Sequence, residues 1–75
     1  MIESFAAIID LWPSAEAFGD AIGTTGANAR KMKARDSIDS SYWESLVAAA
    51  LLRGQKGVTL ELLARLAAQR KGKAA

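Results

Sequence analysis

Four basic side chains fall within six consecutive positions near the middle of this 75-residue chain: Arg30, Lys31, Lys33 and Arg35. Residues 1–29 carry four acidic residues and no basic one, whereas the chain from Arg53 onward carries six basic residues against Glu61 alone. Guanidinium and ammonium groups gathered in this way attract phosphates, so the segregation of charge favours a polyanionic partner. A solvated basic face without a partner remains the alternative for so short a cluster.

Catalytic chemistry has little support in the composition, because the chain contains no cysteine and no histidine. Disulfides, thiol chemistry, the usual zinc sites and imidazole acid–base catalysis are therefore excluded. Two acidic pairs are close in sequence, Asp36 with Asp39 and Glu3 with Asp10, and both fit loop capping or solvated faces better than a perturbed catalytic carboxyl. We expect no enzyme, no metal, no cofactor and no small-molecule substrate.

Apolar spacing and turn residues predict one all-α domain over residues 1–75, a compact bundle of five short helices without strands. The first helix is marked by an apolar stripe with the spacing i, i+3, i+4 and i+7: Phe5, Ile8, Ile9 and Trp12. Pro13 ends it, because proline disfavours helical geometry in the residue before it. Chains this short fold alone only marginally, so nearly every apolar side chain must enter the core.

The second and third helices are marked by capping residues. Ser14 is expected to cap a helix over 15–22, and Gly23 is expected to end it in the left-handed conformation. Thr25 is expected to cap the next helix, which runs to Ala34 or Arg35. Only Gly23 and Thr24 then separate the two helices, so the chain must turn a sharp corner between them.

The rest of the chain predicts two more helices after a polar loop in which Ile38 turns inward. The fourth helix, over 41–53, is closed by Gly54 and has one apolar face: Trp43, Leu46, Val47, Ala50 and Leu51. The fifth is capped by Thr59 and frays into a basic tail at 70–75. Its expected apolar positions are Leu60, Leu63, Ala64, Leu66 and Ala67.

Residues 15–35 have the features of a helix-turn-helix, in which two helices joined by a very short turn lie in close contact. Gly19 falls where the helices would touch, and a larger side chain there would push them apart. Gly23 supplies the backbone freedom that the corner needs. Four apolar residues are expected to fix the pair to the rest of the domain: Phe18, Ile22, Ala29 and Met32.

This pattern resembles the helix-turn-helix of phage Cro and cI-type repressors, the lambda repressor-like fold. The resemblance lies in residues 15–25, AEAFGDAIGTT, followed by Ala29 and Met32. A second likeness lies in Ile38 with the Tyr42-Trp43 pair, because short Cro-like regulators of phages and bacterial mobile elements often read I-P-x-x-Y-W there. This chain has aspartate in place of the proline.

The resemblance implies that the N-terminal half of the helix 25–35 enters the major groove of double-stranded DNA. With Ala29 and Met32 inward, at about 100° per residue, its outward face is centred on Ala27, Lys31 and Ala34. The side chains expected at the DNA are Thr25, Ala27, Asn28, Arg30, Lys31, Lys33 and Arg35.

Each of these residues has a role open to it. Thr25 and the free amides beside it can bind a phosphate, as can the flanking Lys33 and Arg35. Asn28 can pair with an adenine edge, and Arg30 or Lys31 with guanine N7 and O6, while Ala27 can touch a thymine methyl. Small residues at positions 26 and 27, where related repressors often carry base-reading side chains, lower the expected sequence specificity.

We therefore expect a sequence-specific transcriptional regulator, a Cro-like repressor acting in the cytoplasm. Leu52 and Leu62 lie off the apolar stripes of their helices, which suggests a homodimer through the last helix. The alternative on the same scaffold is a protein-interaction module, such as an antiactivator that binds a transcription factor instead of DNA. A membrane-surface role for the basic amphipathic stretch 60–73 ranks last, because the core needs its leucines, and no stretch is long enough to span a bilayer.

Overall fold

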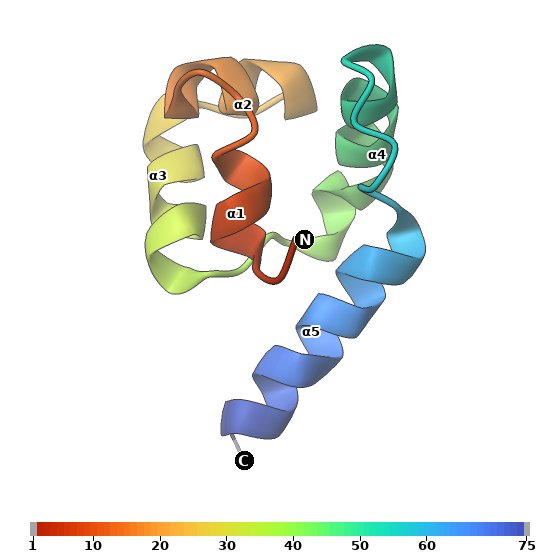
Figure 1. Ribbon diagram of the computed structural model, residues 1–75. Coiled ribbons are helices and arrows are strands. Elements are labelled where there is room, and N and C mark those ends of the chain that lie inside the picture. Colours follow the sequence, from red (N-terminus) through yellow and green to blue (C-terminus); the bar gives the residue numbers. More distant parts are fainter. Residues whose placement is uncertain (1, 75) are drawn as a thin grey trace.

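Five α-helices and one short 3-10 turn make up the described part of the chain, which in this computed structural model comprises the backbone of residues 2–74 and the side chains of residues 2–69 (Figure 1). They are α1 (Phe5–Ile9), α2 (Ala15–Ile22), α3 (Gly26–Arg35), η1 (Ser40–Tyr42), α4 (Trp43–Leu52) and α5 (Leu60–Ala74). The described residues contain no strand, so the predicted all-α class with five helices is confirmed.

The helices surround α1, as Figure 1 shows. α2 runs across one end of α3, and α3 and α4 lie on opposite sides of α1 and α2. α5 begins beside α4 and extends away from the other helices toward the C-terminus. This arrangement leaves the outer side of α3 without a covering helix.

The caps predicted for α2 and α3 are confirmed. The Ser14 hydroxyl accepts a hydrogen bond from the Ala17 amide, and the Thr25 hydroxyl accepts one from the Asn28 amide, both at 3.0 Å. Gly23 has φ +86°, a left-handed conformation that glycine adopts without the steric cost of a Cβ. These local interactions fix where α2 ends and where α3 begins.

The backbones of α2 and the turn into α3 are in direct contact at Gly19. A Cβ atom at this position would lie 2.6 Å from the Thr25 carbonyl oxygen and 2.7 Å from its carbon. The Gly19 carbonyl also accepts a 2.7 Å hydrogen bond from the Thr24 amide. Glycine is therefore required at this contact, as the sequence predicted, because a backbone neighbour cannot move aside as a side chain can.

Asp36 joins the C-terminal end of α3 to the N-terminal end of α1. It ends α3 in the left-handed conformation, with φ +51°, and its carboxylate accepts a 3.0 Å hydrogen bond from the Ala6 amide in the first turn of α1. The expected capping role of Asp36 is thus confirmed. The amide that its carboxylate caps belongs to α1 and not to α3, the helix that Asp36 follows.

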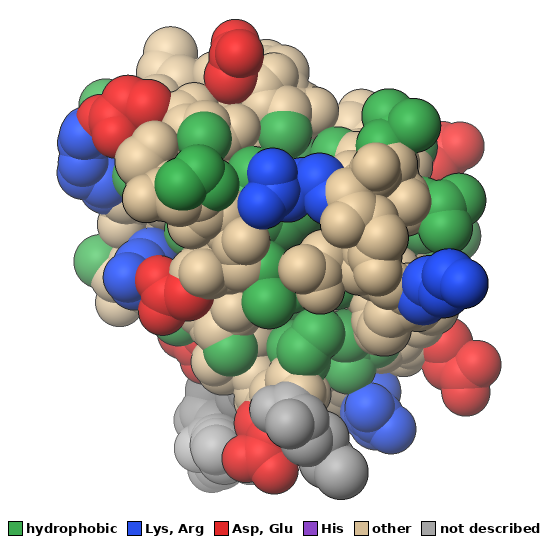
Figure 2. Space-filling model, turned by 45° about the horizontal axis from the view of Figure 1, so that its top comes forward, with side chains coloured by type: hydrophobic (Ala, Val, Ile, Leu, Met, Phe, Trp, Pro, Cys, Tyr) green, Lys and Arg blue, Asp and Glu red, His purple; other side chains and the backbone are tan. Residues whose placement is uncertain are grey.

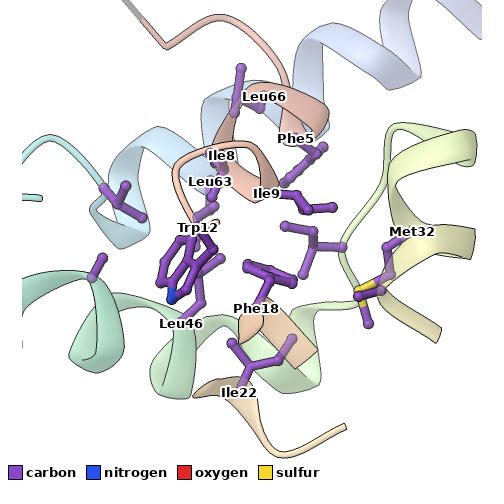
Figure 3. Close-up of a cluster of buried hydrophobic side chains, with 14 of the residues drawn as sticks. Phe5, Ile8, Ile9, Trp12, Phe18, Ile22, Met32, Leu46, Leu63 and Leu66 are labelled. Carbon is purple, nitrogen blue, oxygen red and sulfur yellow. The ribbon is translucent and has the colours of Figure 1, made fainter. Parts of the chain in front are cut away.

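The core is built from apolar residues of all five helices, which converge in Figure 3. Phe18, Ile8, Met32, Leu46 and Leu63 are the largest fully buried side chains. α1 ends at Ile9, earlier than its apolar stripe suggested, and tight i to i+3 hydrogen bonds continue the chain to Trp12. Trp12 is buried all the same, edge-on to the Phe18 ring with the centroids 5.1 Å apart.

The predicted faces of the last two helices are partly wrong. Leu51 and Leu60, placed in the core, are 63% and 49% exposed, whereas Leu62, expected on the surface, is only 6% exposed. In α4 the inward pair is Leu46 and Ala50, which turns Leu51 outward. In α5 the inward positions are Leu62, Leu63 and Leu66, so the helix is rotated by about one residue from the predicted stripe.

Two boundaries also differ from the prediction. α4 begins at Trp43, after the 3-10 turn η1, because Asp39 caps that turn by accepting a hydrogen bond from the Ser41 amide. α5 remains helical to Ala74 instead of fraying, and the side chains of the predicted basic tail at 70–75 lie outside the described residues.

We predict that Gly19→Ala lowers the free energy of unfolding by about 1–3 kcal/mol, because the added methyl group meets backbone atoms. At about 4–8 °C per kcal/mol for a domain of this size, the loss is visible in a thermal melt followed by circular dichroism. Gly26→Ala is the matched control, because the atoms nearest to its Cβ would belong to the Glu16 side chain, which can move aside. Equal stability of the two variants would contradict the proposed contact.

Candidate nucleic-acid interface

The two faces of α3 differ sharply in burial. Ala29 and Met32 are buried against the other helices, as predicted. Ala27, Lys31 and Ala34 are exposed on the opposite face. The open side of α3, which we call the α3 face, is therefore centred on Lys31, with one small residue before it, Ala27, and one after it, Ala34.

Arg30 lies on one flank of the α3 face and forms an ion pair with Glu16 of α2. The Glu16 side chain passes over the start of α3, where a Cβ at Gly26 would lie 2.8 Å from the Glu16 Cγ atom. Because Gly26 has no side chain, the carboxylate of Glu16 can reach across α3 to the guanidinium.

Lys33 is also paired with an acid from another helix. Its Nζ atom lies 2.5 Å from Oδ1 of Asp10, the residue that ends α1. The side chains in the two ion pairs of α3 are 48–60% exposed, and such pairs typically contribute only about 0–1 kcal/mol. Both cations are therefore weakly held and remain within reach of an external anion.

Lys31 is the basic residue of α3 that stays unpaired: no hydrogen bond or ion pair involves it in the described part of the chain. Arg35 lies close enough to Asp39 for its positive charge to help lower the pKa of that carboxyl, after the larger effects of two hydrogen bonds with Ser41. The four basic residues of the sequence cluster are thus in three different electrostatic situations.

Thr25 and Asn28 are engaged in local hydrogen bonds at the start of α3. Besides the capping bond to the Asn28 amide, the Asn28 side-chain nitrogen donates a 2.9 Å hydrogen bond to the Thr24 hydroxyl. The carboxamide oxygen of half-buried Asn28 and the proton of the Thr25 hydroxyl are not used in these bonds. Each side chain thus keeps one group that can contact a ligand.

A polar hollow of about 370 Å³ lies beside the C-terminal half of α3. It is lined by Asn28, Met32, Arg35, Ser37, Asp39 and Tyr42. Only Asn28 and Arg35 were among the predicted site residues; Met32 was predicted in the core and Asp39 in a loop, and Ser37 and Tyr42 had been given no place in the site. Ser37 and Tyr42 lie in the connection after α3. The spacing of Ile38 and Tyr42 indicated a likeness to Cro-like regulators but not a place beside the basic residues.

Acidic residues accompany the basic ones around α3. Residues 1–39 contain six acidic and four basic residues, so this part of the chain has a slight excess of negative charge. Along the left edge of Figure 2, on the side where Figure 1 places α3, red and blue side chains lie next to each other. Glu16 and Asp10 therefore interrupt the basic surface of α3 by pairing with Arg30 and Lys33.

Comparisons with protein-family models, with curated proteins and with solved structures gave no match for this chain. Within the described residues, none of the helices combines the length and the apolar character needed to cross a membrane. What the site can do must therefore be argued from its own geometry.

The lowered pKa of Asp39 gives a prediction for pH. Its carboxylate is stabilised first by the hydrogen bonds with Ser41 and then by Arg35, so its pKa in the folded protein lies below the ordinary value of 3.8. The charged form therefore stabilises the fold above pH 3.8, and this contribution is lost as the pH falls through the lowered pKa. Asp39→Asn keeps a capping oxygen but not the charge.

We expect the parent to be more stable than Asp39→Asn in urea at pH 7, with the difference disappearing toward pH 2. Glu44→Gln, which neutralises an exposed acid on α4, is the control. A stability difference for Asp39→Asn that stays the same from pH 7 to pH 2 would contradict the assigned hydrogen bonds.

Proposed function

We propose that this protein is a DNA-binding transcriptional regulator of the Cro-like type, which places the α3 face in the major groove of double-stranded DNA. The proposal is carried by the open side of α3, where Lys31 is exposed between the small residues Ala27 and Ala34 and has no partner among the described side chains of residues 2–69. A helix with small residues along its outer face can approach base edges closely.

The packing of α2 against α3 supports the proposal. The Gly19 contact and the left-handed turn at Gly23 hold α2 across the end of α3, and the buried Ala29 and Met32 fix the rotation of α3. The repressors that the sequence resembles place the second helix of their helix-turn-helix in the major groove, and we infer the same use for α3. The helix that would enter the groove is thus held by four separate constraints.

In this proposal the bases are read mainly by Lys31, at guanine N7 or O6, with Ala27 against a thymine methyl. Thr25 and the first amides of α3 contact one phosphate. Arg35, Ser37 and Tyr42 around the polar hollow contact another, because each can donate a hydrogen bond to a phosphate oxygen. Arg30 and Lys33 contribute once DNA phosphates compete with Glu16 and Asp10 for them.

The carboxylates beside α3 set the strength of binding. Each lies near the path of the phosphates and opposes non-specific attraction to DNA, so a single domain is expected to bind weakly and with a shallow dependence on salt. The affinity for DNA then depends mainly on contacts to bases. The number of basic residues matters less than the cluster in the sequence suggests.

We predict that Lys31→Ala weakens binding by about 1–3 kcal/mol, the typical cost of losing a base contact. The probe is a duplex enriched from a random-sequence pool with the parent protein, and the measurement is fluorescence anisotropy at low salt. Lys56→Ala, which removes an exposed lysine from the turn between α4 and α5, is the matched control and should bind as the parent does. Parent-like binding by Lys31→Ala would overturn the assignment of the α3 face.

We further predict that Glu16→Gln binds the same duplex more tightly, by about three- to tenfold, because it frees Arg30 for a phosphate and removes a repelling charge. The slope of log K against log salt should also become steeper. Glu61→Gln changes the net charge equally but lies on α5, outside the proposed interface, and should have a much smaller effect. Unchanged or weaker binding by Glu16→Gln would show that Arg30 does not face the DNA.

A second candidate function is a protein-interaction module that binds a transcription factor. The two ion pairs on the flanks of α3 favour it, because they reduce the positive charge that DNA would attract. The same anisotropy experiment separates the candidates: if the parent enriches no duplex from the pool at low salt, DNA binding is excluded and this candidate takes its place.

A further inference from the structure

The C-terminal half of α4 is apolar all round, although most of it lies at the surface. The stretch Leu46–Leu52 contains no polar residue, yet only Leu46 and Ala50 are buried. Leu52 is 90% exposed, more than any other large apolar side chain of the described residues. A helix that is apolar on every side is normally covered on every side, so this surface indicates a protein partner.

A groove lies beside Leu52, between α2 and α4. Its volume is about 380 Å³, and its lining is Trp12, Ala17, Asp20, Ala21, Ala49, Leu52 and Arg53. The alanines on both helices leave the space open, and the nearly buried Trp12 ring contributes to its lining. Figure 2, which brings α2 and the top of α4 forward, shows several apolar side chains spread over this face, around a basic side chain above its centre.

Arg53 is held in place at the groove. Its guanidinium carbon lies 5.3 Å from the centre of the Trp12 ring, and its Nη2 atom donates a 3.3 Å hydrogen bond to the Leu11 carbonyl. Asp20 also lines the groove but forms no ion pair with Arg53 or with any other described residue. The groove thus has one fixed positive and one unpaired negative charge.

We propose that this groove is the contact surface of a homodimer, in which Leu52 of each copy enters the groove of the other. In a two-fold dimer the same surface of both copies forms the contact, so this surface must be complementary to itself. This face meets that condition, because it carries both the projecting Leu52 side chain and the groove that can receive it. Its charges are also self-complementary, because Asp20 of one copy can pair with Arg53 of the second. A partner with mainly positive or mainly negative charge would be repelled by one of these two side chains.

The proposed dimer leaves the α3 face open, because α3 and α4 lie on opposite sides of α1 and α2 (Figure 1). The proposal therefore does not depend on DNA binding, and either can fail without the other. It also replaces α5 as the expected site of self-association: Leu62, on which that expectation partly depended, is buried.

Sedimentation equilibrium of the full chain without DNA, from micromolar to millimolar concentration, tests the proposal. The parent should approach twice the monomer mass, and Leu52→Glu should raise the dissociation constant at least tenfold. Leu51→Glu is the matched control, since Leu51 is an exposed leucine of the same helix that does not line the groove. Circular dichroism verifies that each variant is folded.

A charge swap tests the proposed ion pair between Asp20 of one copy and Arg53 of the other. Asp20→Arg should weaken the dimer, and combining it with Arg53→Glu should restore it, because the pair re-forms with reversed sign. A parent protein that stays monomeric at millimolar concentration overturns the proposal. The proposal is also overturned if the monomer binds an added amphipathic helical peptide instead of a second copy. Equal dissociation by Leu51→Glu and Leu52→Glu, or a double variant no better associated than Asp20→Arg alone, contradicts it as well.

Discussion

The close approach of two backbones at Gly19 is the constraint on which the rest of this structure depends. It lets α2 lie across the end of α3, and with α2 in that place the apolar side of α3 can reach the core through Ala29 and Met32. The outer side of α3 is then left open by geometry alone. None of the other helices in the described residues 2–74 covers it (Figure 1).

Electrostatics modifies what this open helix can do. The fold brings Glu16 and Asp10 to the flanks of α3, where they pair with Arg30 and Lys33, and leaves Lys31 unpaired in the middle. A surface of this kind binds DNA through a few central contacts, with the acids limiting non-specific attraction. The apolar groove between α2 and α4 lies away from α3, so the molecule has two separate surfaces with different chemistry.

Local signals in the sequence were sufficient for the elements around the site. Ser14, Gly23 and Thr25 act within one turn of their own positions, and so they predicted the limits of α2 and α3 correctly. The ion pairs of α3 join residues 14 and 23 positions apart, which no helical period relates, and they could not be predicted. The rotations of α4 and α5 were missed because apolar residues occur on several of their sides, so that tertiary packing decides which of them enter the core.

A titration of ¹⁵N-labelled protein with a duplex enriched from a random pool tests whether α3 contacts DNA. Amide resonances report contact residue by residue without any substitution. We expect the largest shifts in residues 25–37, with a second group at Tyr42 and little effect on α5. Shifts confined to α4 and α5, or none at low salt, would contradict a role for α3 in binding DNA.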